Sequence, residues 1–397
     1  MRSAVIVDAV RTPAGRGKPG GALSGVHPVD LLAGVLEALI QRSALDPHLV
    51  EDVIGGCVTQ AGEQAMNVTR QAVLAAGLPH EVPATTVDRQ CGSSQQAAHF
   101  AAQGVLAGTY EVVIACGVES MSRVPMFSST AGADPFGERL ARRYPQGLVN
   151  QGVSAELIAA RWKLDRLGLD EFAARSHALA TAAAEAGAFA RETLPVTVPG
   201  PDGDDVTVSR DETVRPGTTV EALGGLKPSF RNDATAARFP EIAWQVTPGN
   251  SSPLTDGASA VLIMEERRAV RLGLTPRARF HAMTVVGDDP LLMLTGPIPA
   301  TRKVLERARL SVADIDAFEV NEAFAPVPLA WLHELDVDPG RLNPRGGAIA
   351  LGHALGSSGT RLLTTLLHHL EDTGGRYGLQ TMCEGGGLAN ATVIERL

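Results

Sequence analysis

Residues 91–117, CGSSQQAAHFAAQGVLAGTYEVVIACG, run from a Gly-Ser-Ser turn through an alanine-rich helical pattern into a run of apolar residues. Near the C-terminus, residues 355–386, LGSSGTRLLTTLLHHLEDTGGRYGLQTMCEGG, follow the same order. Gly-Ser-Ser alone is a common tripeptide, but here the helix and the strand that follow it match as well. The two segments therefore predict a fold that is duplicated along the chain.

Other short apolar runs predict further strands of the same kind. Runs of Val, Ile and Ala bounded by Gly are typical of strands that are buried on both faces. They are AVIVDAV (4–10), DVIGGCV (52–58), EVVIACG (111–117), SAVLIM (259–264), RFHAMTVVG (279–287), AFEV (317–320) and LQTMC (379–383). Apolar residues at i, i+3 and i+4 spacing over 31–40 predict a helix with Asp30 as its candidate cap. This alternation predicts the α/β class with a mainly parallel sheet.

The middle of the chain has a different character. Loops containing Pro, Arg and Gly surround two helical stretches at 152–162 and 169–190, and a charged, turn-rich segment follows at 199–217. We interpret this region as an insertion that lies over the core. The expected division is an N-terminal half at 1–120 plus 251–275, an inserted loop domain at 121–250, and a C-terminal half at 276–397.

Composition excludes several classes of function. The 397 residues include 35 Lys and Arg against 44 Asp and Glu, a formal charge of −9, so no basic field attracts nucleic acid or an anionic membrane. The chain has four cysteines, no C-x-x-C pair and no Cys-His cluster typical of a metal site. No apolar stretch reaches 18 residues, and the N-terminus lacks a signal-peptide pattern. We therefore expect a cytoplasmic protein without a metal.

Cys91 is the first candidate for chemistry. It directly precedes a helical pattern, and the positive end of a helix dipole favours the nucleophilic thiolate. Three further polar residues stand in Gly-rich or small-residue motifs at strand ends: Asn321 in NEAFAP, His353 in GHALGSSG and Cys383 in TMCEGGG. Each alone has a structural explanation, as a buried cysteine, a turn residue or a core histidine. Together they supply the nucleophile, base and oxyanion donor of covalent catalysis.

A larger set of motifs resembles the thiolase family, which comprises 3-ketoacyl-CoA thiolases and acetyl-CoA acetyltransferases. The motifs are RTPAGRGKPGGALSG (11–25), CGSSQQA (91–97), CGVESMSRVPM (116–126), VTPGNSSPLTDGASAVLIM (246–264), GPIPATRK (296–303), NEAFA (321–325), GGAIALGHALGSSGTR (346–361) and MCEGGG (382–387). They occur in the family's order over nearly the whole chain. The resemblance implies two similar halves stacked as five α-β-α-β-α layers with an inserted loop domain, and a homodimer or homotetramer.

The resemblance also implies a role for each site residue. Cys91 is expected to attack a 3-oxoacyl-CoA, and His353 to take its proton with a pKa near neutrality. Cys383 is expected to exchange a proton with the carbon of acetyl-CoA. Asn321, through a water and together with His353, is expected to stabilise the enolate oxygen, while the backbone N–H groups of Cys91 and Gly385 form a second oxyanion site.

Coenzyme A is expected as a substrate, with no metal or redox cofactor. Ser252 and Arg215 match positions that contact the pantetheine and adenosine parts of CoA in the family, and Phe230 is expected to line the pocket. Surface arginines and loop serines are common, so these three residues also have ordinary structural explanations. A hydratase-dehydrogenase is a possible partner protein.

The chain departs from the family pattern at several positions. Ala354 stands where many members have Pro, Ser94 where they have Gly, and Glu384 where an aliphatic residue is common. An acid beside a thiol raises the pKa of that thiol through like-charge repulsion. Residues 150–152 read NQG where short-chain biosynthetic members often have His-Met-Gly, which favours a broader acyl pocket.

Thiolytic cleavage of 3-oxoacyl-CoA in fatty-acid or steroid-like lipid degradation is therefore the leading functional hypothesis. Condensation of two acetyl-CoA molecules is an alternative with the same fold. A ketoacyl-synthase relative is a second alternative, although those enzymes pair their cysteine with two histidines, or with His and Asn, rather than with a second cysteine. A catalytically silent acyl-CoA-binding or scaffold protein is a third.

Overall fold

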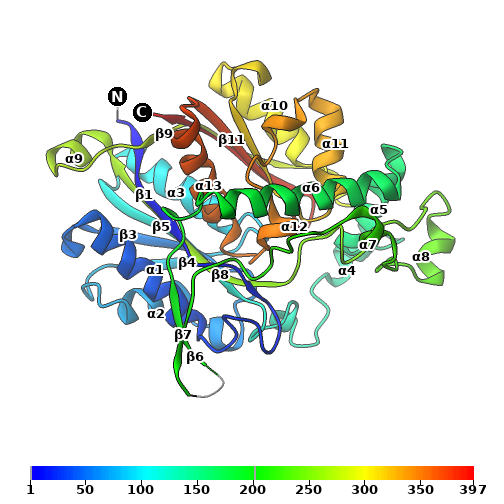
Figure 1. Cartoon of the computed structure of the whole chain (residues 1–397), viewed down its shortest axis with the longest axis horizontal. Helices are drawn as coiled ribbons and strands as arrows, with labels where there is room; N and C mark the ends of the chain where they lie inside the picture. The colour runs from blue at the N-terminus through cyan, green and yellow to red at the C-terminus, as the bar shows by residue number, and fades with distance from the viewer. Residues whose placement is uncertain (1, 201–202) are drawn as a thin grey trace.

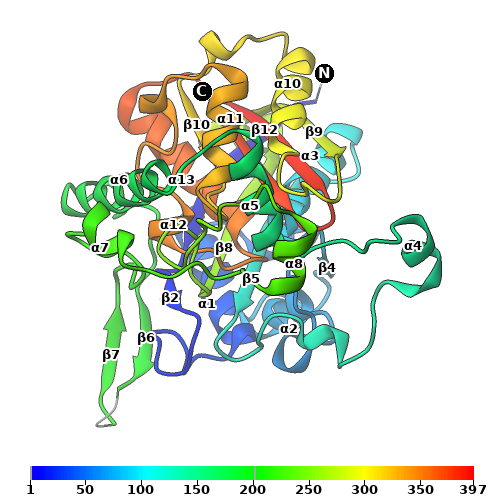
Figure 2. The ribbon, with the colours of Figure 1, turned by 90° about the vertical axis from the view of Figure 1, so that its right-hand side faces the viewer.

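The computed structural model describes residues 2–200 and 203–397. Its strands form one large sheet and a small separate hairpin (Figures 1 and 2). The order across the large sheet is β10 (Ala317–Val320), β11 (Tyr377–Glu384), β12 (Leu388–Arg396), β9 (Ala278–Gly287), β1 (Ala4–Arg11), β8 (Thr255–Glu265), β5 (Val112–Ser120), β3 (Asp52–Gly56) and β4 (Ala84–Val87), with β2 (Gly15–Arg16) paired to β8. The hairpin consists of β6 (Val196–Pro199) and β7 (Asp205–Val208).

Two half-sheets meet where β1 pairs with β9. Their junction consists of two residue pairs, Val5 with Arg279 and Ile6 with Ala278. One half contains β4, β3, β5, β8 and β1, and the other contains β9, β12, β11 and β10. The short junction lets the halves face each other across a shared layer of helices.

The helices lie in three layers around the half-sheets. α1 (Pro28–Ser43) and α2 (Val68–Ala75) cover the outer face of the first half, and α10 (Pro297–Ala308) and α11 (Pro326–Leu335) that of the second. α3 (Ser93–Ala107) and α13 (Ser358–Thr373) lie between the halves and contact each other. The predicted order of five α-β-α-β-α layers is confirmed.

Three hydrophobic clusters fill the spaces between these layers. Leu32 and Leu36 of α1 belong to the first outer cluster, and Trp331 of α11 belongs to the second. The middle cluster combines alanines of α3, such as Ala101, with leucines of α13, such as Leu367. Burial of apolar area at about 25 cal/mol per Å² stabilises each layer contact.

The two Gly-Ser-Ser turns of the duplicated segments lie against each other at the centre of the molecule. The backbone N–H of Thr360 donates to Oγ of Ser94 at 3.0 Å. A Cβ added to Gly359 would lie 2.0 Å from the backbone N of Gln95, and one added to Gly117 would lie 2.2 Å from the carbonyl oxygen of Gly356. The small residues in both motifs therefore permit the close approach of α3, α13 and β5.

The prediction of a mainly parallel sheet is wrong. Among the described residues, β3 pairs in parallel with β4 and β5, and β10 with β11, whereas the other strand pairs of the large sheet are antiparallel. Strands with apolar residues on both faces are typical of parallel sheets. Here the helix layers on both sides of each half-sheet account for that burial whatever the strand direction.

Asp30 is not the cap of α1. The helix begins at Pro28, and the N-cap is His27, whose Nδ1 accepts from the backbone N–H of Val29 at 3.2 Å. Proline suits the first helical position because it has no N–H to satisfy there. Asp30 lies in the first turn, where its charge favours the positive end of the helix dipole.

Between β5 and β8 the chain leaves the layered core. This segment carries α4 (Gly137–Arg143), α5 (Gln151–Arg161), α6 (Arg166–Glu185), the β6–β7 hairpin, α7 (Val220–Gly224) and α8 (Asp233–Arg238). α5 contacts α11, and α6 contacts α12 (Ala348–Leu351). The hairpin projects from the body in Figure 1, and α4 projects in Figure 2. Within the part of the chain that the structure describes, the remaining helices are α9 (Glu266–Arg271) and five short 3₁₀ turns at 47–49, 62–64, 128–130, 312–314 and 339–341.

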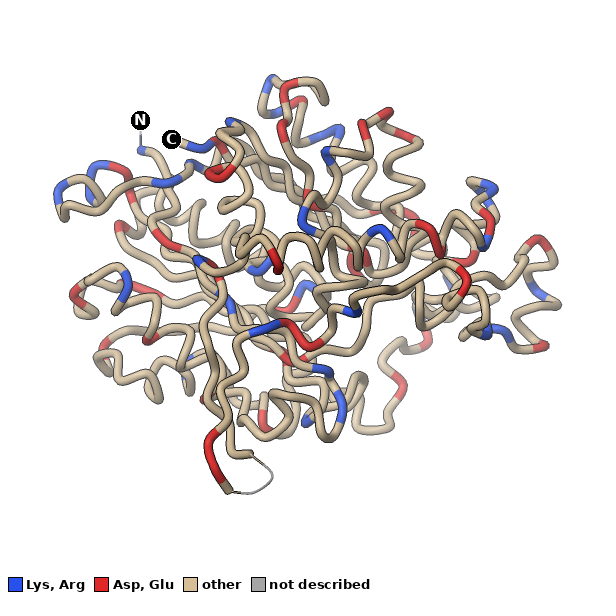
Figure 3. The backbone as a smooth tube through the Cα atoms, in the orientation of Figure 1, with Lys and Arg blue, Asp and Glu red and all other residues tan. Residues whose placement is uncertain are grey.

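Charges are distributed over the whole chain. Lys and Arg lie close to Asp and Glu on most elements, so the net charge of −9 is not confined to one part (Figure 3). Within residues 2–200 and 203–397, no helix combines the length and the apolar character that crossing a lipid bilayer requires.

Candidate active site

Cys91 lies at the start of the central helix α3. It directly precedes Gly92, the N-cap of that helix, and its side chain is buried among Leu362, Met382 and Leu355. Burial raises the pKa of Cys91 to about 12, the charge of Glu384 adds to this effect, and nearby backbone N–H groups oppose it. The backbone N–H groups favour the thiolate in the expected direction, but desolvation outweighs them.

Gly385 and Cys383 come to Cys91 from the end of β11. The backbone N–H groups that lower the pKa of Cys91 are its own and that of Gly385. Cys383 is fully buried, and the charge of an ionised Cys91 is among the causes that raise its pKa. The structure thus brings the two thiols and these two N–H groups into one buried site.

His353 follows α12 and is held in one tautomer. Its Nδ1 lies 2.6 Å from Oγ of Ser358, and that hydroxyl donates its hydrogen to the carbonyl oxygen of Ala354 at 2.8 Å. Ser358 can therefore only accept from His353, which places the ring proton on Nδ1 and leaves a lone pair on Nε2. In this tautomer the imidazole can act as a base through Nε2.

The imidazole of His353 is neutral in this site. Burial, helped by the charge of Arg361, lowers the pKa of His353 to about 3. The expectation of a pKa near neutrality is wrong, because burial of the ring penalises the charged form. A neutral imidazole with its lone pair on Nε2 accepts a proton only when a newly formed anion nearby stabilises the resulting cation.

Asn321 lies directly against this base. Its Nδ2 is 3.3 Å from Nε2 of His353, and its Oδ1 has no hydrogen-bond partner among the described residues. The following residue, Glu322, is fully buried and accepts hydrogen bonds from Ser176, Asn343 and the backbone N–H of Ile349. Glu322 thereby anchors the turn that carries Asn321.

Glu119 anchors the centre of the site from β5. Its carboxylate accepts from the backbone N–H groups of Val58, Thr59 and Gly356, at 2.9, 3.0 and 2.9 Å. Gly356 belongs to the second Gly-Ser-Ser turn, three residues after His353. Ser358, Glu322 and Glu119 were missed by the sequence analysis, although they belong to motifs quoted there, because their partners are far away in the sequence.

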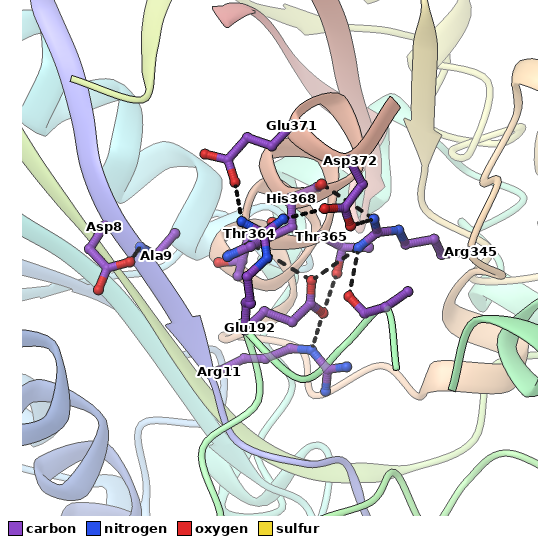
Figure 4. A network of polar contacts seen from close by, with 12 residues as sticks. Asp8, Ala9, Arg11, Glu192, Arg345, Thr364, Thr365, His368, Glu371 and Asp372 are labelled. Atoms are coloured by element: carbon purple, nitrogen blue, oxygen red, sulfur yellow. Dashed lines mark hydrogen bonds and ion pairs between the residues drawn. The ribbon is translucent and has the colours of Figure 1, made fainter. Parts of the chain in front are cut away.

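A buried ionic network fixes α13 behind the site (Figure 4). Glu192, which follows α6, is fully buried and accepts from Nε of Arg11 at 2.7 Å and from Oγ1 of Thr365 at 3.0 Å. Its other carboxylate oxygen lies 4.0 Å from Arg345 and 3.8 Å from His368. The network links β1, the segment after α6 and the helix that follows the His353 loop.

The three expected CoA contacts occupy two places. Oγ of Ser252 donates to the carbonyl oxygen of Ala323 at 3.2 Å, and the ring of Phe230 packs edge-to-face on Phe324 at 5.9 Å. Both therefore lie beside the turn of Asn321. Arg215 is exposed and lines a pocket of about 30 Å³ together with His177, Thr218 and Ser251.

Comparisons with known proteins agree with this arrangement. The family descriptions "Thiolase, N-terminal domain" and "Thiolase, C-terminal domain" match residues 4–267 and 274–396. The chain is 47% identical to the steroid 3-ketoacyl-CoA thiolase FadA6 of Mycobacterium tuberculosis, covering all of this chain and 95% of that protein. It is 46% identical to a 3-ketoacyl-CoA thiolase of Pseudoalteromonas translucida, covering both in full.

A solved structure is similar over the same length. The crystal structure of the Bacillus anthracis acetyl-CoA acetyltransferase matches with a TM-score of 0.89 and 39% identity, covering 100% of this chain and 99% of that one. The family match, the full-length relatives and the shared fold lead to one conclusion: the chain belongs to the thiolase family.

Proposed function

We propose that the protein is a 3-ketoacyl-CoA thiolase, an acetyl-CoA C-acyltransferase of fatty-acid or steroid-like lipid degradation. It cleaves a 3-oxoacyl-CoA with CoA to acetyl-CoA and an acyl-CoA that is two carbons shorter. The observation that carries this proposal is the pair of buried thiols, Cys91 and Cys383, together with a neutral His353 whose Nε2 carries a lone pair and faces the amide of Asn321. Relatives named 3-ketoacyl-CoA thiolase support the degradative direction.

The first half-reaction transfers the acyl group to the protein. The thiol of Cys91 gives its proton to Nε2 of His353, and the sulfur attacks the 3-keto carbon. The bond between C2 and C3 then breaks, its electron pair leaves with the acetyl-CoA enolate, and Cys383 protonates that carbon. A thioester remains on Cys91.

The second half-reaction releases the product. A CoA thiol loses its proton to the thiolate that Cys383 has become, attacks the thioester carbonyl and expels Cys91, which recovers its proton from His353. The N–H groups of Cys91 and Gly385 stabilise the tetrahedral oxyanion, each by about 3 kcal/mol. Asn321 stabilises the enolate oxygen together with His353, through a water held at its unpartnered Oδ1.

CoA is the proposed co-substrate, and the segment at 121–250 is the proposed domain that covers it. Ser252 and Phe230, beside the turn of Asn321, are assigned to the pantetheine side, and Arg215 to the adenosine side. We also propose a homodimer or homotetramer. Light scattering on the purified protein measures that state, and a monomer at micromolar concentration would contradict it.

Trapping of the acyl-enzyme tests the mechanism. After incubation with acetyl-CoA or acetoacetyl-CoA, peptide mass spectrometry is expected to find an acyl group on Cys91 and none in the Cys91→Ser variant. An unmodified Cys91 in a folded protein would favour a silent acyl-CoA-binding protein instead.

Condensation of two acetyl-CoA molecules is a second candidate, favoured by the similar structure of an acetyl-CoA acetyltransferase. The kcat/KM values for acetoacetyl-CoA and for medium-chain, long-chain and polycyclic 3-oxoacyl-CoAs separate the two functions. We expect the larger substrates to be preferred. A strong preference for acetoacetyl-CoA would reject the degradative assignment.

A further inference from the structure

Glu384 is a fully buried acid beside the proposed nucleophile. It is the last residue of β11, and because side chains alternate along a strand, it faces away from Cys383 and toward α3. A Cβ added to Gly92 would lie 2.0 Å from Oε1 of Glu384. The carboxyl group therefore touches the N-cap of the helix that begins directly after Cys91.

This carboxyl group has no well-formed hydrogen bond, although the backbone N–H of Asn390 lies near enough to favour its charged form. Among the described residues, neither of its oxygens receives a hydrogen bond, and no cation lies within ion-pair distance. The side-chain Nδ2 of Asn390 donates to the carbonyl oxygen of Gly92 at 3.1 Å. An unpaired buried carboxylate is costly, so such a group retains its proton over a wider pH range.

The groups around Glu384 affect this proton in opposite directions. Burial is the largest cause and raises the pKa of Glu384 to about 8, with a further contribution from the charge of Asp88. The charge of Arg89 and the backbone N–H of Asn390 lower it. At neutral pH the protonated, uncharged form of Glu384 therefore predominates.

Cys91 and Glu384 are thus two acidic groups at the same N-terminal end of α3, and the ionisation of one disfavours the ionisation of the other. The helix dipole favours one anion at this place, and two anions on either side of Gly92 repel each other, so their titrations are coupled. Ionised Glu384 is the second cause, after burial, that raises the pKa of Cys91, and the charge of Glu119 contributes less. It also raises the pKa of Cys383.

We propose that Glu384 is a positioning residue that acts on Cys91 through its charge. While Glu384 is protonated, Cys91 can ionise. Once Glu384 has lost its proton, its negative charge opposes the ionisation of Cys91. Glu384 thereby sets an alkaline limit to the formation of the nucleophile. An aliphatic side chain at this position, as is common in the resembled family, cannot impose such a limit. The proposal rests on the proposed role of Cys91 as the nucleophile.

Alkylation of Cys91 tests this coupling without requiring turnover. Iodoacetamide labelling is followed by peptide mass spectrometry between about pH 6.5 and 10, in the wild type and in the isosteric Glu384→Gln variant. We expect similar rates below about pH 7. Above about pH 8 the wild-type rate stops rising while the variant rate continues to rise, until they differ about tenfold, which corresponds to one pKa unit.

Cys116 is the internal control. Burial alone raises its pKa, so its labelling rate measures how often the buried core opens to the reagent at each pH. A ratio of Cys91 rates that is constant at all pH values would indicate a purely structural role and overturn the proposal. If Glu384→Gln does not fold, the wild type alone decides, since an unbroken rise to about pH 10 also overturns it. Failure to trap an acyl group on Cys91 would reject the proposed function and leave this coupling measurable.

In turnover, kcat/KM of the wild type is expected to decline above about pH 8, and this alkaline limb is expected to shift upward in Glu384→Gln. An alkaline limb at the same pH in both proteins would contradict the proposed control by Glu384. Glu384→Leu, which carries an aliphatic side chain, provides a second variant and is expected to shift the limb in the same direction.

Discussion

The hydroxyl of Ser358 holds His353 in the tautomer that acts as a base, and its removal tests the role of the imidazole. In the wild type Nδ1 of His353 lies 2.6 Å from Oγ of Ser358, and in Ser358→Ala the hydrogen on Nδ1 loses this acceptor in a buried site. The tautomer with hydrogen on Nε2 then becomes competitive. That form presents no lone pair to Cys91, so it cannot take the thiol proton.

The size of the effect follows from the burial of this hydrogen bond. A buried donor without a partner costs about 1–3 kcal/mol, and His353 is 5% exposed. At about 2 kcal/mol, kcat/KM for a 3-oxoacyl-CoA is expected to fall about 30-fold. Ser358→Thr retains a hydroxyl and is expected to recover most of the loss.

Ser357→Ala is the matched control. Ser357 is equally buried in the same turn, and its Oγ lies 2.8 Å from Oγ of Ser259 instead of contacting His353. Steady-state kinetics of the variants, with thermal unfolding to confirm folding, should show kcat/KM of this control within about twofold of the wild type. Equal losses in Ser357→Ala and Ser358→Ala, or no loss in either, would refute the proposed fixation of the tautomer.

Two further predictions concern stability. Glu192→Ala removes the carboxylate at the centre of a buried ionic network and should lower the free energy of unfolding by about 3 kcal/mol, which lowers Tm by about 4 °C at an unfolding entropy of about 0.8 kcal/mol per kelvin. Scanning calorimetry should find no shift in Tm for the exposed control Glu138→Gln. Equal Tm values for the wild type and Glu192→Ala would contradict the network's role. Gly359→Ala would place a methyl group 2.0 Å from the backbone N of Gln95 and should lower Tm by forcing α3 and α13 apart, whereas Gly34→Ala, at an open helical position, should raise it slightly; a raised Tm for Gly359→Ala would show that the two helices separate at little cost.

The residues of the candidate site differ in how far the sequence could identify them. Cys91, His353, Cys383 and Asn321 stand in distinctive small-residue motifs, and the structure places Asn321 against His353 and the two thiols in one site. Ser358 belongs to one of these motifs, but its contact with His353 depends on how the loop between the two residues folds. Its role as acceptor became apparent only from the hydrogen bonds around it.

The electrostatic expectations failed for a single physical reason. The sequence predicted a helix after Cys91, and a helix N-terminus stabilises a thiolate. The sequence did not predict how completely the five layers remove water from Cys91 and His353, and that desolvation reverses the expected pKa of both groups. A local dipole depends on adjacent residues, whereas burial depends on every layer that surrounds the site.

By itself the sequence determined the alternation of strands and helices, the duplicated plan and the family, because periodicity and small-residue motifs are local properties of the chain. Only the tertiary structure decided the antiparallel directions in the sheet, the two-residue junction of β1 with β9, and the contact between the two Gly-Ser-Ser turns. It alone also placed Glu384 against Gly92. Strand direction and contacts between distant residues depend on how the layers close around one another, and no short stretch of sequence specifies that closure.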